Sequence, residues 1–234
     1  MNTDRAWIAE SAEFLRSALS SSPLGRYAGL FESDRVASDR SLEDCLLRSL
    51  EDFTADLARW QLQLDDPKDL FERLLLAPQL EATYFYRVSR ACFLRGVERA
   101  PLVIAALSRL LTGTEIYFSA EIGPGLKLIH GLGSVIGTGC RIGRSFTVYQ
   151  GVTIGDKLGK ETGKQPVIGD RVIASAGAQV LGPVTVGSET VIGANSVVLD
   201  SVPGRCVVAG APARIKVANL SDEAFGEFWA AIKG

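Results

Sequence analysis

The second half of the chain is dominated by a repeat of six residues, which is clearest in VIGDRVIASAGAQVLGPVTVGSETVIGANSVV (residues 167–198). In this stretch an aliphatic or small side chain returns at every sixth position, and a glycine often follows it. An amphipathic helix repeats its apolar positions about every 3.6 residues and a strand about every 2, so neither element alone explains the pattern. The full series is Ile136, Ile142, Val148, Ile154, Ile168, Ala174, Val180, Val186, Ile192 and Val198.

The period predicts a parallel β-helix of triangular cross-section, in which each group of six residues supplies one short strand and one corner. We expect about four coils between Ile122 and Pro203, each built from three such groups. The recurring aliphatic side chain then points inward and stacks on its copies in the neighbouring coils. A glycine after it suits a tight corner, where a Cβ would crowd the backbone or forbid the required dihedral angles.

Two interruptions break the repeat. The frame slips by two residues between Leu128 and Ile136, and by eight between Ile154 and Ile168. The second slip means that residues 156–167, DKLGKETGKQPV, leave the coil as a loop. Both breaks lie close to polar residues that the coil does not need, so we expect functional residues there.

The first half of the chain has a helical pattern. Apolar residues recur at spacings of three and four over residues 4–20, 41–64 and 68–96, with Ser41 and Asp66-Pro67 as helix starts. The sequence therefore predicts an α+β protein with a helical N-terminal domain followed by the β-helix.

We place the domain boundaries where these patterns change. The helical domain covers residues 1–112, the β-helix covers 113–216, and a C-terminal helical tail covers 217–234.

Composition excludes several classes of function. The formal net charge of −2 gives no basic surface for nucleic acid or an anionic membrane. The N-terminus has no apolar signal region, and the longest apolar run, residues 101–111, is too short to span a bilayer. The cysteines form no CxxC pair, so we expect buried, reduced thiols, no metal site and a cytoplasmic location. These cysteines are Cys45, Cys92, Cys140 and Cys206.

His130 is the only histidine of the chain, and it lies next to the first interruption. A lone histidine among aliphatic residues is often only structural. Imidazole is nevertheless the side chain whose ordinary pKa, about 6.5, best suits a general base at neutral pH. His130 is therefore the candidate catalytic residue.

Five segments give the chain a family resemblance. They are TEIYFSAEIGPGLKLIHG (114–131), VYQGVTIGDKLGKETGKQP (148–166), VIASAGAQVLG (172–182), VIGANSVVLDSVP (191–203) and AGAPARI (209–215). In these segments the chain resembles the serine acetyltransferases, which belong to the hexapeptide-repeat acyltransferases with a left-handed β-helix. The resemblance implies acetyl-CoA as co-substrate, a hydroxyl acceptor and a homotrimer, which in some members pairs into a hexamer.

The resemblance also implies roles for individual residues. His130 is the general base, and Glu115, where the family has an aspartate, orients it. Gly155, Ala176 and Ala194 match positions along the pantetheine arm of CoA. Arg214, close to the AGAPAR turn, is then placed to meet a CoA phosphate.

The acceptor site departs from the family pattern. Ile129 stands where the family has an aspartate that helps to hold the substrate ammonium. Lys164 and Gln165 replace an Arg-His pair that faces the substrate carboxylate, which removes the bidentate fork of arginine. Another ammonium-binding aspartate of the family matches Asp56 or Asp65. The acceptor thus stays open between a serine-like hydroxy amino acid and a sugar hydroxyl.

Two further functions compete with acyl transfer. A metal-dependent β-helix of the carbonic anhydrase type needs three histidines, and this chain has one. A β-helix without activity would serve as an assembly partner, as serine acetyltransferases do when their tail docks into a sulfhydrylase. The interacting tails end in isoleucine, whereas this chain ends AAIKG, so we expect no such docking.

Overall fold

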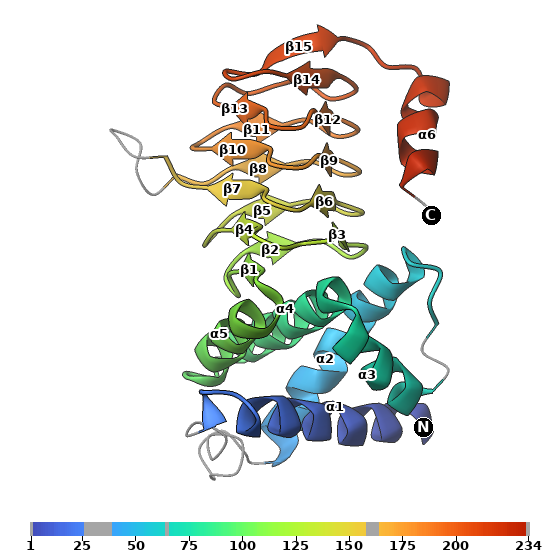
Figure 1. Cartoon of the computed structure of the whole chain (residues 1–234), viewed down its shortest axis with the longest axis vertical. Coiled ribbons are helices and arrows are strands. Elements are labelled where there is room, and N and C mark those ends of the chain that lie inside the picture. The colour runs from blue at the N-terminus through green and yellow to red at the C-terminus, as the bar shows by residue number, and fades with distance from the viewer. Residues whose placement is uncertain (1, 26–38, 64–65, 158–163, 233–234) are drawn as a thin grey trace.

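The computed structural model describes residues 2–25, 39–63, 66–157 and 164–232. A group of helices at one end carries a tall stack of short strands, and a last helix lies beside the stack (Figure 1). This arrangement confirms a helical N-terminal region followed by a parallel β-helix. The N-terminal helices are α1 (Asn2–Ser20), α2 (Asp39–Ala58), α3 (Pro67–Leu76), α4 (Pro78–Leu94) and α5 (Ala100–Thr112).

The helix starts were predicted with mixed success. Asp66 caps α3 as expected, because its carboxylate accepts a hydrogen bond of 2.9 Å from the Lys68 backbone N–H. Ser41 is not the start of α2, which begins two residues earlier, at Asp39. The helical pattern expected over residues 68–96 is divided into two helices, since Pro78 follows the end of α3 and is the first residue of α4.

The β part consists of three sheets that run along the stack. Sheet A contains β1, β4, β7, β10 and β13, sheet B contains β2, β5, β8 and β11, and sheet C contains β3, β6, β9, β12, β14 and the antiparallel β15. The strands are β1 (Glu115–Ile116), β2 (Glu121–Ile122), β3 (Lys127–Ile129), β4 (Val135–Ile136), β5 (Arg141–Ile142), β6 (Thr147–Tyr149), β7 (Thr153–Gly155), β8 (Val167–Ile168), β9 (Ile173–Ala174), β10 (Gln179–Leu181), β11 (Thr185–Val186), β12 (Val191–Ile192), β13 (Val197–Val198), β14 (Val207–Ala209) and β15 (Arg214–Val217).

Strand pairing confirms both interruptions of the repeat. Val135 pairs with Thr153, eighteen residues later, which is the regular length of one coil. Glu115 pairs with Val135, twenty residues later, so the first coil carries two extra residues, and the pairing of Ile129 with Tyr149 places them between Ile129 and Val135. Thr153 pairs with Gln179, twenty-six residues later, so the extra eight lie in the loop between β7 and β8.

The glycines after the aliphatic positions allow neighbouring coils to approach closely. A Cβ added to Gly169 would lie 2.6 Å from the backbone nitrogen of Ser188 in the next coil. This confirms crowding as a reason for glycine. The dihedral reason was wrong for these positions, because the left-handed conformation occurs two residues later in each group, for example at Gly139 (φ 69°) and Arg171 (φ 57°).

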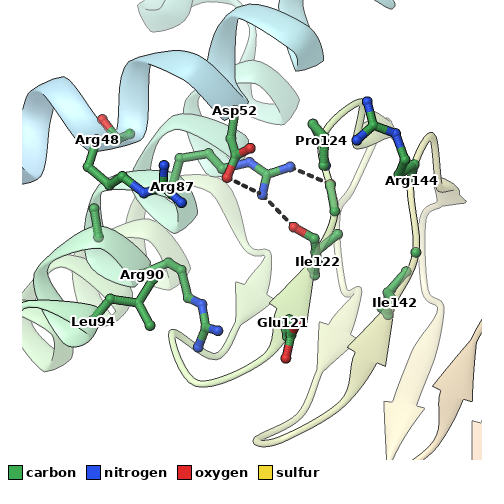
Figure 2. A pocket seen from close by; sticks show the side chains of 14 residues that line it. Arg48, Asp52, Arg87, Arg90, Leu94, Glu121, Ile122, Pro124, Ile142 and Arg144 are labelled. Atoms are coloured by element: carbon green, nitrogen blue, oxygen red, sulfur yellow. Dashed lines mark hydrogen bonds and ion pairs between the residues drawn. The ribbon is translucent and has the colours of Figure 1, made fainter.

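Helix α4 covers the open end of the first coil. The Tyr86 hydroxyl donates to the carbonyl of Ala120 (2.9 Å), and Arg87 donates to the carbonyls of Ile122 (2.7 Å) and Gly123 (2.8 Å). Figure 2 shows Arg87 reaching from α4 to the backbone of this coil. Exposed strand edges need such partners, so α4 caps the β-helix by satisfying backbone groups of its first coil.

Candidate active site

His130 lies at an exposed corner between sheet C and sheet A, directly after β3. Its φ angle is 63°, a left-handed conformation that is uncommon for residues other than glycine. Gly131 is also left-handed (φ 75°), so the two extra residues of this coil make a turn that the other coils lack. The imidazole makes no hydrogen bond or ion pair with any other residue that the structure describes. Within the part of the chain that the structure describes, the imidazole therefore faces solvent.

The same corner continues upward as a column of small or polar side chains. Backbone hydrogen bonds set its levels, because the Gly151 N–H donates to the Leu132 carbonyl (3.0 Å) and the Gly177 N–H donates to the Gln150 carbonyl (2.9 Å). Gln150 therefore lies one coil above Leu132, and the His130 turn is inserted directly before Leu132 at the foot of the column. The next levels of this corner column are Ala176 and Ala194, as the pairing of Ala174 with Val148 and Ile192 requires. Two of the three residues expected along the CoA arm thus share one edge of the molecule with His130.

Glu115 begins sheet A one coil below Val135, which follows the His130 turn. Its carboxylate forms an ion pair of 3.2 Å with Arg109 of α5, and His130 is not its partner. The Arg109 and Glu115 side chains are 63% and 35% exposed, so water screens their attraction. Exposed pairs of this kind contribute about 0–1 kcal/mol, so little holds Glu115 in this position.

Gly155, Lys164 and Gln165 lie at a different corner, between sheets A and B. The Gln165 Oε1 atom accepts a long hydrogen bond of 3.7 Å from the Cys140 thiol, which places it beside the coil. A Cβ added to Gly155 meets no atom within 4 Å, so the space beside this glycine is open. One chain does not bring this corner together with His130.

Asp56 has a structural environment that sequence reasoning did not foresee. Its carboxylate is 1% exposed, accepts 2.7 and 2.9 Å hydrogen bonds from Arg87, and accepts backbone N–H bonds from Gly125 (2.8 Å) and Leu126 (2.6 Å). Burial alone would lower the pKa of Arg87, but the Asp56 carboxylate raises it above its ordinary value. Arg87 therefore stays charged and forms an ion pair with Asp56. These four hydrogen bonds give Asp56 a structural role at the contact between α2, α4 and the first coil. Asp65, the other candidate, lies outside the described residues.

Two other predicted residues have partners of their own. Ile129 is half-buried and packs against an apolar cluster made with the C-terminal helix α6 (Asp222–Ala231). Arg214 is exposed in β15 and lies 3.4 Å from Asp200. This exposed pair leaves the guanidinium accessible from solvent.

A pocket of about 410 Å³ lies where α2 and α4 meet the first coils (Figure 2). Arginine side chains from both domains line it, together with Asp52 and Glu121. None of the corner-column residues does, so this pocket is separate from the His130 corner. Its arginines are Arg48, Arg87, Arg90 and Arg144.

Sequence reasoning missed two residues around His130. Gln150 lies in the next coil at the same corner. The sequence could have shown this, because the two-residue slip makes the coil twenty residues long at this point. Lys127 is 1% exposed, and its Nζ atom donates a 2.6 Å hydrogen bond to the carbonyl of Ile232. A charged residue inside LKLIHG was the only sequence signal for that contact.

Within the described ranges, no three His, Cys, Asp or Glu side chains are grouped so as to hold a metal ion. The four cysteines are buried and form no disulfide. Among the helices that the structure describes, none has the length and apolar character needed to cross a membrane.

Comparison with known proteins gives the family. Residues 165–200 match the family model "Bacterial transferase hexapeptide (six repeats)". A serine acetyltransferase from Bacillus subtilis (strain 168) is 42% identical over 153 residues, which is 65% of this chain and 70% of that protein.

Solved structures agree with this match. The crystal structure of serine acetyltransferase from Neisseria gonorrhoeae superposes with a TM-score of 0.68 at 27% identity, covering 94% of this chain and 82% of that one. A serine acetyltransferase in complex with CoA gives a TM-score of 0.64 at 27% identity, covering 87% of this chain and 83% of that one. The chain therefore belongs to the serine acetyltransferase family of hexapeptide-repeat transferases.

Proposed function

We propose that this protein transfers an acetyl group from acetyl-CoA to the hydroxyl of L-serine, with His130 as general base. The relatives named above are serine acetyltransferases, and one of the superposed structures is a complex with CoA. The observation that carries the assignment of the base is the exposed corner position of His130, the only histidine of the chain, with no competing partner among the described residues. The four reduced thiols support a cytoplasmic location.

The reaction needs one proton to move twice. His130 takes the proton of the serine hydroxyl while the oxygen attacks the thioester carbonyl carbon, giving a tetrahedral intermediate. The carbon–sulfur bond then breaks, and the imidazolium returns the proton to the departing CoA thiolate. Glu115, released from its weak pair with Arg109, would orient the imidazole and stabilise its charged form.

We infer that the working form is a trimer with its active sites between neighbouring chains. His130 and the Lys164-Gln165 segment lie at different corners of one chain, so a neighbour is needed to bring them together. Helix α6 covers sheet C, whereas Leu132, which is 67% exposed, lies on the turn leading into sheet A. Ring-closing contacts through sheets A and B are therefore favoured, and the helical domain is left to join two trimers.

Product analysis tests the acceptor. Purified protein should convert acetyl-CoA and L-serine to O-acetyl-L-serine, measured by mass spectrometry and by release of free CoA thiol. L-homoserine and a set of hexoses are the comparison acceptors, because the apolar Ile129 favours a sugar hydroxyl as the alternative. Transfer to a hexose alone would replace serine as the substrate, and no transfer to any acceptor would favour the assembly-partner function.

The corner column supplies a test of where acetyl-CoA binds. Ala176→Leu should raise the KM for acetyl-CoA about tenfold or more, because a larger side chain projects into the path proposed for the pantetheine arm. The KM for serine should change little. Ala218→Leu makes the same chemical change at an exposed alanine away from this corner and is the matched control. Equal KM values for the two variants would contradict this placement.

A further inference from the structure

The C-terminal helix α6 lies against the outer face of sheet C, with its end near the level of β3 (Figure 1). Phe225 and Ile232 are buried on Ile173 and Val191 of this sheet. Ile129, the residue before His130, packs against the same cluster. The strand that leads to the candidate base is thus enclosed between the core of the β-helix and α6.

Arg205 and Ser221 hold α6 at its start. Arg205 donates to the Leu220 carbonyl from Nε (3.0 Å) and Nη2 (2.8 Å), and also forms a 2.7 Å ion pair with Asp222. Ser221 caps the helix by accepting a 3.1 Å hydrogen bond from the Ala224 N–H. These contacts fix the direction in which the helix leaves the β-helix.

Two arginines hold the middle of α6. The Arg59 guanidinium lies 4.3 Å from the centre of the Trp229 ring, and Arg171 lies 5.0 Å from the Phe225 ring. Arg59 also donates to the Gly125 carbonyl (2.9 Å) and to the Thr147 hydroxyl (3.0 Å) of the β-helix. The helical domain, the β-helix and the tail therefore meet around this one arginine.

Lys127 holds the end of α6. It is the first residue of β3, it is buried, and its ammonium lies between the Ile232 carbonyl (2.6 Å) and the Trp60 ring (4.4 Å from the centre). Burial lowers the pKa of Lys127, and the nearby Arg59 lowers it further. Lysine is almost never fully buried unless it is paired. Removing the Lys127 ammonium from water is unfavourable, and its contacts with Ile232 and Trp60 must offset that loss of hydration.

We propose that Lys127 and α6 form a clasp that fixes β3 and so positions His130 for proton transfer. Lys127 is three residues from His130 on the same strand and turn, and the clasp covers both Lys127 and Ile129. Catalytic groups must be held to a fraction of an ångström, and strands packed on both faces do this better than free loops. Lys127 is a positioning residue, because it acts through the backbone and does not touch the substrates.

The test compares three variants with the full-length protein. Lys127→Met keeps the apolar stem and removes the donor, a chain ending at Ala218 removes α6, and a third protein combines both changes. Lys216→Met, at an exposed lysine of β15, is the matched control. The readouts are kcat, the KM of each substrate, and the NMR signal of ¹³C-labelled histidine, which reports on His130 alone if no histidine tag is used.

Lys127→Met and the shortened chain should each lower kcat about tenfold, with the KM for acetyl-CoA changed less than about twofold. Both should shift or broaden the His130 signal, and the combined variant should be no worse than the shortened chain, because both changes break the same contact. Lys216→Met should match the parent in every readout.

The proposal is overturned if the folded, shortened chain keeps both the parent kcat and the parent His130 signal. It is also overturned if the effects of the two changes multiply in the combined variant. The inference rests on the proposed role of His130, but the NMR signal tests the clasp even if His130 proves not to be the base. If the clasp variants change the His130 signal while a separate His130→Ala protein keeps full activity, the proposed function is rejected, but the effect of the contact between α6 and β3 on His130 is retained.

Discussion

Replacing His130 with alanine should lower kcat for acetyl transfer by roughly two to four orders of magnitude, the usual contribution of a general base. The serine hydroxyl would then lose its proton only to water, whereas the binding of acetyl-CoA would not change, since proton removal is needed only in the transition state. Steady-state kinetics with both substrates varied measures the loss. Calorimetry with CoA and light scattering are the controls, and both should give the parent values, including a trimer.

The pH profile makes this test specific to an ionising base. For the parent protein, kcat/KM should rise with pH through one ionisation of the free enzyme, and that step should be missing from the residual activity of His130→Ala. A folded, trimeric His130→Ala protein that retains activity within a few-fold of the parent would remove His130 from the mechanism.

Glu115 should matter less than His130, because its loss leaves the base in place without its orienting charge. The kcat of Glu115→Gln should therefore be lower than that of the parent protein but higher than that of His130→Ala. Glu121→Gln is the matched control, as Glu121 is also the first residue of a short strand in the same coil but lies on sheet B. A loss of the same size in both glutamine variants would indicate a general effect on the coil.

The coil itself was predictable because its signal is local. Each group of six residues carries its own inward side chain and its own corner, so Ile136, Ile142 and Val148 are enough to set the frame of one coil. The same frame made the two interruptions visible, and hence the unusual position of His130. Counting along the frame also predicts which residues share a corner, as with Ala176 and Ala194.

The contacts between domains were not predictable, since they join residues far apart in the sequence. Asp56 lies 31 positions from Arg87 and 70 from Leu126, and Lys127 lies 105 positions from Ile232. No periodic pattern records such distances. An aspartate in an amphipathic helix and a lysine in a strand look like solvent-facing residues until the surfaces that bury them are known.

Ile129 shows how one contact changes the interpretation of a substitution. From the sequence, an isoleucine before the base meant that an ammonium ligand had been lost. In the structure this side chain packs on the cluster that includes Phe225 and Ile232 of the tail. An apolar residue is therefore what docking of α6 requires at this position, and the serine ammonium, if bound, needs another partner.

Asp56→Asn should lower the free energy of unfolding by about 3–5 kcal/mol, the usual cost of removing one member of a buried ion pair. The Arg87 guanidinium is 2% exposed and would lose its bidentate partner, while the N–H groups of Gly125 and Leu126 would face a neutral amide. The β-helix and the helical domain meet at this point. Chemical denaturation at one fixed protein concentration measures the loss.

The control lies one helical turn earlier. Asp52 is 3.6 Å from the same guanidinium, but its side chain is 40% exposed, so Asp52→Asn should cost less than about 1 kcal/mol. A substrate-binding role for Asp56 predicts the opposite pattern, namely a stable Asp56→Asn protein with a raised KM for serine. Replacing both partners, as in Asp56→Leu with Arg87→Met, should recover part of the lost stability, because no buried charge is then left unpaired. The recovery should be incomplete, because backbone groups of residues 122–126 lose their side-chain partners. Recovery of stability without recovery of serine affinity would mean that Asp56 has both roles, whereas recovery of both assigns it to the domain junction alone.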